Sequence, residues 1–180
     1  MLSVVCPIYN EEKYIRGCIE SIVAQDYPKD CLEVLFVDGM SVDATRGIVV
    51  EYSKRFPFIR LLDNPKKIVP SAMNIGIQAA KGEIIIRLDA HAYYCDNYFS
   101  VLVKRLEELN ADNVGCVCKT DVLSKTPKTL AICEVLGNRF GVGNSTFRTG
   151  VDNIMEVDTV PFGCWRSDVF KKYGLYDERL

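Results

Sequence analysis

The sequence predicts an α/β protein whose mostly parallel sheet is covered by helices on both faces. Short apolar, β-branched segments alternate with amphipathic segments of helical periodicity from residue 2 to about residue 120. Apolar strands linked by helices form parallel sheets, because each helical connection must cross one face of the sheet. With 180 residues, of which 48% are hydrophobic, the chain suits a single domain spanning residues 1–180.

The expected elements of the first half follow this alternation. LSVVCPI is a buried strand closed by a polar turn, and Asn10 is a candidate cap for the amphipathic helix that follows. Apolar, β-branched composition assigns the strands, and the spacing of apolar residues assigns the helices. The expected segments are strand 2–8, helix 11–25, strand 32–38, helix 43–55 and strand 58–63.

The second half continues the pattern and then loses it. A helix is expected to start at Pro70 and to end near Lys81, with Gly82 as its C-cap. The expected segments that follow are strand 83–89, helix 96–109, strand 114–120, a glycine-rich mobile loop at 136–150, and a short strand and helix within 157–174.

Composition excludes several classes of function. The net charge of −2 and the scattered lysines and arginines argue against a nucleic-acid partner. No apolar run is long enough to span a bilayer, and the first residues lack the features of a signal peptide. Eight cysteines in such a chain are expected to be reduced, most of them small core residues, and a structural zinc site is not favoured.

Three expected strands end on polar residues that can bind a ligand. The first exits into Pro7, Tyr9 and Glu11, the second into Asp38, and the fourth into Asp89-Ala90-His91. In parallel α/β sheets, ligands bind at the carboxyl ends of the strands. Each exit by itself is equally consistent with an ordinary turn residue or helix cap. Together they favour one shared binding site.

The phosphate-binding glycine motifs are absent. The first strand is followed by CPIYNEE rather than GxGxxG, and no GxxxxGK[ST] occurs, which argues against a nicotinamide-dependent oxidoreductase. A divalent ion held by Asp89 and His91 would neutralise ligand phosphates instead, because carboxylate oxygen and imidazole nitrogen suit Mn²⁺ or Mg²⁺ when substrate oxygens complete the site. The alternative for His91, the only histidine, is an ordinary loop residue.

The order of four motifs resembles glycosyltransferase family 2. These are CPIYNEE, FVDGMSVDAT, NPKKIVPSAMNIGIQAAKGEIIIRLDAH and VPFGCWRSDVFKKYGLYDERL, which together reach from about residue 2 to residue 180. The similarity is greatest to bacterial exopolysaccharide enzymes of the succinoglycan type. It implies the GT-A fold, a Rossmann-like, three-layer α/β/α architecture that binds nucleotide sugars.

The resemblance also implies roles for residues at the strand exits. Pro7, Tyr9 and Glu11 would line the nucleotide pocket, together with Asp89. Asp38 would accept hydrogen bonds from the uracil or the ribose.

The metal motif departs from the family pattern. Asp89 and His91 stand at the Asp-x-Asp position, where His91 replaces the second carboxylate and brings no negative charge. Asn74 and Gly76 would support the junction between the next helix and the pocket, and the pair Lys66-Lys67 is either a diphosphate contact or a solvated surface pair.

The catalytic base and the acceptor side are less defined. In the family the base is an Asp in an acidic motif that follows a segment like GLYDERL, so it is expected beyond Leu180, in a longer protein of which this chain is the front part. Asp158, Asp177 and Glu178 are the alternatives within the chain. On the acceptor side, Phe162, Gly163 and Trp165 are candidates, and Trp165 is equally expected in the core.

The resulting expectation is a metal-dependent, inverting glycosyltransferase. It would move a sugar from a nucleoside diphosphate donor, UDP in particular, to a saccharide or lipid-linked acceptor during cell-surface polysaccharide synthesis. The expected location is cytoplasmic and peripheral at the inner face of the membrane, with membrane contact made only by regions beyond residue 180. A non-catalytic nucleotide-sugar-binding module is the alternative from a different class, and a nucleotidyltransferase is a further one.

Overall fold

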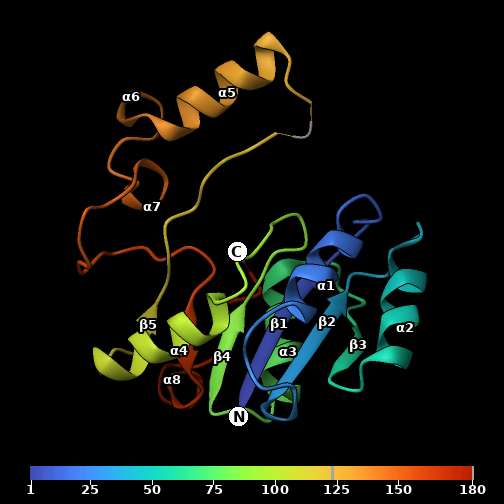
Figure 1. Ribbon diagram of the computed structural model, residues 1–180. Helices are drawn as coiled ribbons and strands as arrows, with labels where there is room; N and C mark the ends of the chain where they lie inside the picture. Colours follow the sequence, from blue (N-terminus) through green and yellow to red (C-terminus); the bar gives the residue numbers. More distant parts are fainter. Residues whose placement is uncertain (123, 180) are drawn as a thin grey trace. The chain divides into compact units, whose positions relative to one another are not determined.

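The computed structural model describes residues 1–122 and 124–179. Contacts between residues divide the chain into two units, one formed by residues 1–114 and 162–180 and the other by residues 115–161. The first unit contains the sheet and the second contains α5, α6 and α7 (Figure 1).

The first unit is built on one sheet with the strand order β3-β2-β1-β4-β6-β5. Parallel pairing joins β1 to β2, β1 to β4 and β2 to β3, which confirms the parallel sheet expected from the alternation of elements. Only β6, which returns from late in the sequence, is antiparallel to its neighbours. The strands are β1 Leu2–Ile8, β2 Leu32–Asp38, β3 Ile59–Asp63, β4 Ile84–Arg87, β5 Asn113–Val114 and β6 Cys164–Arg166.

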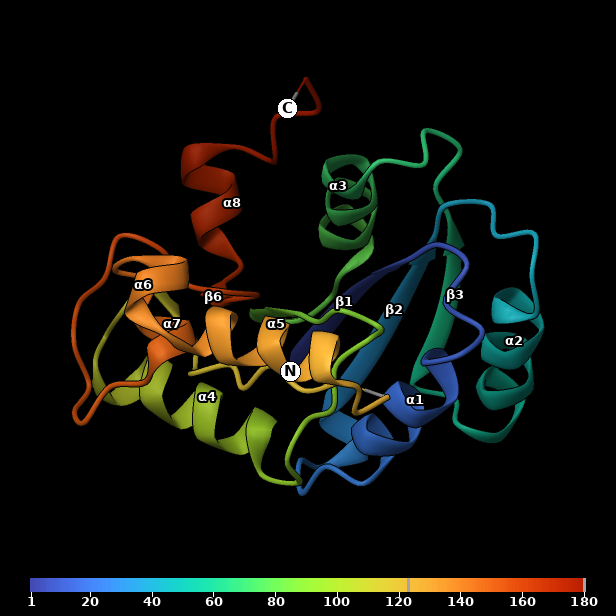
Figure 2. The same cartoon turned by 90° about the horizontal axis from the view of Figure 1, so that it is seen from above.

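Helices cover both faces of this sheet, which confirms the three-layer α/β/α architecture. Figure 2 shows α3 and α8 on one side of the strands, and α1 and α4 on the other. The helices of this unit are α1 Ile15–Val23, α2 Thr45–Arg55, α3 Val69–Ala79, α4 Tyr98–Glu108 and α8 Asp168–Tyr173, with a 3-10 turn η1 at Lys29–Cys31.

The core lies where α3 meets the central strands. One cluster of buried side chains holds Val5, Leu35, Val37, Ala72, Met73 and Ile85. Burying a side chain of this size contributes about 1.5–3 kcal/mol. Gly76 allows the close approach of helix and strand, because a Cβ at this position would lie 2.3 Å from Cγ1 of Val5. This packing holds α3 against β1 and β2, and so fixes the residues that follow those strands.

Two local predictions about helix ends are wrong. Asn10 does not cap α1, which begins later, at Ile15; its backbone is left-handed (φ 53°), and its Oδ1 accepts a hydrogen bond from the Val42 N–H. Gly82 is not the C-cap of α3, because the helix ends at Ala79. Its N–H donates to Ser3 Oγ, and a Cβ there would lie 2.6 Å from the Ser3 backbone N, so the glycine serves a tight approach to β1.

The second unit differs from the sequence prediction in kind. The expected strand 114–120 is limited to β5, which ends at Val114, and the described part of residues 115–161 forms no strand. Helices α5 Pro127–Gly137, α6 Arg139–Val142 and α7 Thr146–Thr149 replace much of the loop expected at 136–150. The start of α5 has a sequence pattern typical of a helix start. Thr126 forms a capping box with Thr129, and Pro127 occupies the first helical position.

The cysteines take fewer core positions than expected. Cys6, Cys18 and Cys164 are buried thiols in the core of the first unit, and burial raises the pKa of Cys164 to about 12. Cys31 and Cys95 are exposed. The expectation that most cysteines are core residues is therefore wrong, although the buried ones do behave as small apolar side chains.

Candidate nucleotide-binding site

A hollow of about 150 Å³ opens at the carboxyl ends of β1 and β4. Parallel pairing of these two neighbouring strands brings the residues after each of them to one edge of the sheet. Five of the predicted site residues line the hollow, namely Pro7, Tyr9, Glu11, Asp89 and His91. Pro7 and His91, which are 84 positions apart in the chain, thus line the same hollow, as the strand exits predicted.

Glu11 and His91 face each other across the hollow. Glu11 Oε1 lies 3.2 Å from His91 Nδ1, and the Glu11 side chain is largely buried while His91 is exposed. The Glu11 backbone N–H donates to Thr45 Oγ1 over 2.7 Å, which fixes the turn after β1 against the start of α2. The pair offers one carboxylate and one imidazole to a ligand.

Asp89 is held from two directions. Nε and Nη2 of Arg87 donate to its Oδ1 over 3.2 and 3.1 Å, and the backbone of Asp89 exchanges hydrogen bonds with the Tyr94 hydroxyl at 2.9 and 3.0 Å. Burial raises the pKa of Tyr94, so its hydroxyl stays protonated and continues to donate to the Asp89 carbonyl oxygen. The carboxylate is therefore fixed at the exit of β4.

Asp38 lies behind the hollow rather than on its lining. It is fully buried, and its carboxylate accepts hydrogen bonds from the Ser41 N–H and from Arg46 Nη1, the latter over 2.6 Å. Arg46 also binds Asp63, and these two carboxylates raise the pKa of the Arg46 guanidinium. The neighbouring Gly39 does line the hollow. Asp38 is thus firmly paired within the protein.

Two lining residues were missed by the sequence reading. Asn64 is 1% exposed, and its Oδ1 is buried without a hydrogen-bond partner in the described parts of the chain, while Nδ2 donates to the Ile68 carbonyl. Arg87 is the other, and it is the last residue of β4. Both stand at strand exits, so the reasoning used for Asp38 and Asp89 applies to them as well. A buried unpaired oxygen is costly, so this atom is a candidate acceptor for a bound ligand or water.

Lys67 also lines the hollow, whereas Lys66 does not. Lys67 has a left-handed backbone (φ 61°), and its Nζ lies 5.9 Å from the ring centroid of Tyr9. Lys66 is instead bound to Glu178. The two lysines that the sequence treats as a pair therefore have different surroundings.

The segment near the end of the chain braces α3. Both polar atoms of the buried Asn74 side chain bind it, since Oδ1 accepts from the Tyr176 N–H and Nδ2 donates to Glu178. Lys66 and Asn74 lower the pKa of Glu178, and Arg179 lowers that of Asp177. Both in-chain alternatives for the base, Asp177 and Glu178, are thus already paired with side chains of the protein.

The candidates for the acceptor side do not line the hollow. Gly163 has φ 86°, and a Cβ there would lie 2.3 Å from the Trp165 ring. Trp165 packs edge-on against Phe170 with ring centroids 5.7 Å apart. Phe162 has φ 60°, and the Gly163 carbonyl accepts from the Arg87 N–H. Asp158 belongs to the second unit.

Similarity to known proteins identifies the family. The sequence pattern described as glycosyl transferase family 2 matches residues 3–174. The chain belongs to glycosyl transferase family 2. Within this family it is 32% identical over 177 residues to the succinoglycan biosynthesis protein ExoA of Rhizobium meliloti, a match that covers 97% of this chain and 52% of the relative.

A second relative comes from an archaeon. Identity is 28% over 175 residues, covering 95% of this chain and 54% of the relative, which is the dolichyl N-acetyl-alpha-D-glucosaminyl phosphate 3-beta-D-2,3-diacetamido-2,3-dideoxy-beta-D-glucuronosyltransferase of Methanococcus voltae. The chain therefore spans about half the length of the curated relatives it matches.

Solved structures of similar fold confirm the GT-A architecture. TarS of S. aureus (residues 1–349, in complex with UDP) superimposes with a TM-score of 0.71 at 22% identity, over 97% of this chain and 49% of that fragment. The mannosyltransferase PcManGT of Pyrobaculum calidifontis, in complex with GDP-Man and Mn²⁺, gives a TM-score of 0.70 at 23% identity over 98% of this chain and 47% of that structure.

Proposed function

We propose that this chain is the donor-binding part of a metal-dependent, inverting glycosyltransferase that uses a nucleoside diphosphate sugar, UDP-linked in particular. The observation that carries the proposal is the hollow, which gathers Tyr9, Glu11, Asp89 and His91 with Lys67 at one edge of the sheet. The proposed acceptor is a saccharide or a lipid-linked saccharide. The names of relatives that make succinoglycan or act on dolichyl phosphate sugars support this class of acceptor.

The nucleoside is proposed to lie between Tyr9, Asp38 and Asn64. The half-exposed Tyr9 offers a ring for the base, and the unpaired Asn64 Oδ1 accepts from one of its N–H groups or from a ribose hydroxyl. Asp38, held by Arg46 and Ser41, supplies a fixed acceptor behind them. If so, Asp38→Ala weakens uridine and UDP binding by the same factor.

The residues at the proposed metal site fit a divalent ion only with help from the donor. Carboxylate and imidazole are ligands that Mn²⁺ accepts, and Asp89 and His91 both line the hollow. The described residues contain no group of three or more His, Cys, Asp or Glu side chains able to hold an ion. Diphosphate oxygens must therefore complete the coordination, as is usual for Mg²⁺ and Mn²⁺ at phosphate sites.

The mechanism assigns binding and orientation to this chain. When bound, the ion supplies Lewis-acid stabilisation of the charge that develops on the leaving diphosphate. Asp89 and His91 would hold it, while Tyr9, Asp38 and Asn64 would orient the nucleotide. The acceptor oxygen attacks the anomeric carbon from the face opposite the diphosphate and gives its proton to a base there; the new glycosidic bond forms as the bond to the diphosphate breaks, so the configuration inverts. We place that base beyond Leu180.

A non-catalytic nucleotide-sugar-binding module is the second candidate. It is favoured by the position of two in-chain alternatives for the base, because Asp177 and Glu178 are not among the described residues that line the hollow. Both candidates predict donor binding, and only the first predicts turnover in the full-length protein.

Two measurements test the proposal. Calorimetry with UDP and Mn²⁺ should show binding to the chain, and full-length protein should convert a UDP-sugar to product with inverted configuration at the anomeric carbon. Absence of UDP binding with and without Mn²⁺ refutes both candidates. Binding without product from any acceptor refutes the enzyme and leaves the module.

The location of the protein is part of the proposal as well. None of the helices in the described part of the chain has the length and apolar content needed to cross a bilayer. We place the protein in the cytoplasm, peripheral at the inner face of the membrane, because nucleotide sugars and lipid-linked acceptors meet there.

A further inference from the structure

The lining of the hollow carries an unusual balance of charge. Two carboxylates, Glu11 and Asp89, face two cations, Lys67 and Arg87. The position that the family pattern assigns to a second aspartate holds the His91 imidazole, which brings no negative charge. The side chains therefore sum to about zero formal charge before a ligand enters. The diphosphate of a nucleotide sugar carries one negative charge per phosphoryl group, and the free diphosphate that leaves carries an additional one, which a single divalent ion does not offset.

Arg87 is placed to bind the remaining phosphate charge. It is the last residue of β4, its backbone pairs with β1, and its N–H donates to the Gly163 carbonyl over 3.1 Å. The side chain thus starts from a rigid point at the edge of the sheet. Arginine suits this role because its planar, permanently charged fork matches two phosphate oxygens.

The present contacts of Arg87 leave donors unused. Nε and Nη2 converge on a single oxygen of Asp89, and Nη1 makes no hydrogen bond within residues 1–122 and 124–179. The side chains of Arg87 and Asp89 are 27% and 20% exposed, so the pair faces the hollow rather than the core. An ion pair of this kind is exchangeable, because solvent screening limits what it contributes.

From these contacts we propose that Arg87 is a diphosphate-binding residue, a step that rests on the proposed function. In the unliganded chain its guanidinium neutralises Asp89. When the donor and the divalent ion bind, the ion takes over Asp89 and the guanidinium turns to the diphosphate oxygens. Lys67, which is exposed and has its Nζ near the Tyr9 ring, adds a weaker contact.

The test compares Arg87→Gln with Arg60→Gln. Arg60 is a matched control, because it also binds a carboxylate, Glu33, from a strand of the same sheet, and it does not line the hollow. Calorimetry at saturating Mn²⁺ should show UDP affinity lowered about tenfold in Arg87→Gln, as expected for a lost charged hydrogen bond, and uridine affinity unchanged. Arg60→Gln should leave both affinities unchanged.

A second readout uses Mn²⁺ alone. Removing a cation that competes for Asp89 should tighten Mn²⁺ binding in Arg87→Gln, measured by electron paramagnetic resonance without nucleotide. Arg87→Lys, which keeps the charge and loses the fork, should give an intermediate UDP affinity; this variant also decides the matter if Arg87→Gln is poorly folded.

The outcomes separate this inference from the proposed function. If the parent chain binds UDP with Mn²⁺ but the variants lose UDP and uridine affinity equally, or lose neither, Arg87 does not bind the diphosphate. If the parent chain does not bind UDP at all, the proposed function itself fails.

Discussion

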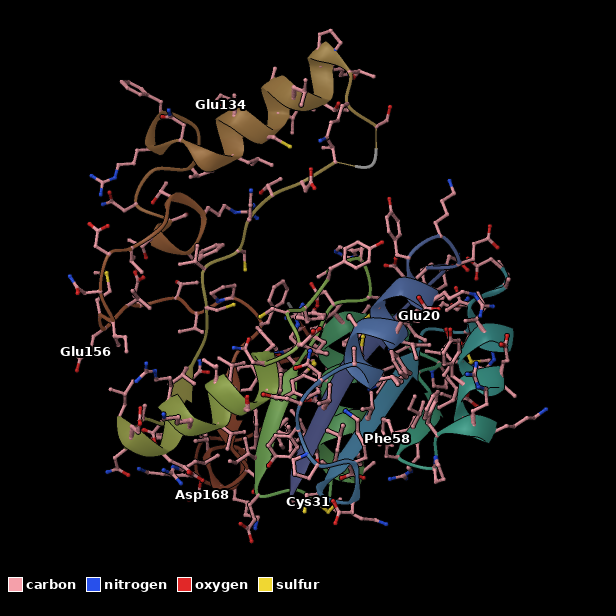
Figure 3. The ribbon with its side chains drawn as sticks, viewed as in Figure 1. Glu20, Cys31, Phe58, Glu134, Glu156 and Asp168 are labelled. Carbon is pink, nitrogen blue, oxygen red and sulfur yellow. The ribbon has the colours of Figure 1, made fainter. Side chains whose placement is uncertain are left out.

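At the amino ends of the strands, buried polar groups satisfy one another, whereas at the carboxyl ends the hollow leaves polar atoms without a protein partner. Strand β2 begins directly after Cys31 and strand β3 directly after Phe58; both residues are labelled in Figure 3. There the Ser3 hydroxyl donates to Glu33 Oε1 over 2.6 Å and accepts from the Gly82 N–H over 2.7 Å. Arg60 completes the cluster by binding the other oxygen of Glu33.

The polar groups at the carboxyl ends of the strands differ from those at the amino ends in how far they are paired. The Asn64 Oδ1 atom has no partner in the described chain, and the guanidinium of Arg87 uses only part of its donors. Lys67 forms no ion pair with a described carboxylate; its Nζ lies over the Tyr9 ring. A closed cluster contributes to stability, while unpaired groups are costly unless a ligand pairs them. The polar groups at the amino ends therefore stabilise the fold, and the carboxyl ends are where we propose that the ligand binds.

The largest effect is expected from Asp89→Ala at the carboxyl rim. It should abolish the Mn²⁺-dependent part of UDP affinity, a loss of about a hundredfold or more, since even partners of metal ligands contribute up to that amount. Calorimetry with and without Mn²⁺ measures it. Asp30→Ala, an exposed carboxylate before β2, is the control and should behave as the parent. Unchanged UDP affinity in Asp89→Ala would remove the metal from the proposal.

Glu33→Ala tests the amino rim. It leaves the buried Ser3 hydroxyl and the Lys81 N–H without their acceptor, which should lower the free energy of unfolding by about 2 kcal/mol. Urea denaturation measures this loss. UDP affinity, measured below the denaturation midpoint, should stay the same. A variant that kept its stability but lost UDP binding would contradict the division between the two rims.

Asn64→Ala should have the opposite effect to Glu33→Ala, with a fall in ligand affinity and little change in stability. It removes the acceptor proposed for the nucleoside, so UDP and uridine affinity should both fall about tenfold. Stability should change by less than about 1 kcal/mol, because the lost bond to Ile68 is offset by removal of an unpaired buried oxygen. Calorimetry and urea denaturation on the same sample give both numbers. A large loss of stability with normal affinity would make Asn64 a structural residue.

The smallest effect is expected from Lys67→Gln. Its long, exposed side chain gives a screened contact to the diphosphate, so UDP affinity should fall only about twofold, and less at high salt. Lys66→Gln is the matched control, because Lys66 binds Glu178 and does not line the hollow. Titrations of UDP at low and high ionic strength measure the difference, and equal effects from the two lysines would show that only net charge matters.

The two units of the chain explain where prediction from the sequence succeeded. In the first unit every expected strand and helix up to residue 109 exists, because alternating apolar segments must be buried on both faces of a parallel sheet. Figure 3 shows side chains gathered around the strands there, and side chains projecting along α5, where Glu134 is labelled. The described residues of 115–161 include no buried side chain. No face of an element there has to be apolar, so the sequence shows no periodic pattern from which the elements could be predicted.

The candidate site was predicted in part for a related reason. Strand exits can be read from the sequence, and they located Tyr9, Glu11, Asp89 and His91 on the hollow. The exit of β3 was not read in this way, so Asn64 was missed. Arg87 was missed because a charged residue that ends a strand gives no sign of which face it takes.

The sequence by itself determined the α/β/α sheet, the family, and the edge at which the site lies, because periodicity and motif order are local properties of the chain. Only the tertiary structure decided which polar atoms at that edge are already paired. The Asp38 carboxylate is already paired with Arg46 and Ser41, whereas Asn64 Oδ1 has no hydrogen-bond partner among the described residues, and both outcomes depend on how the folded chain places these groups. Hydrogen-bond satisfaction is a property of those contacts, so it cannot be read from residue order.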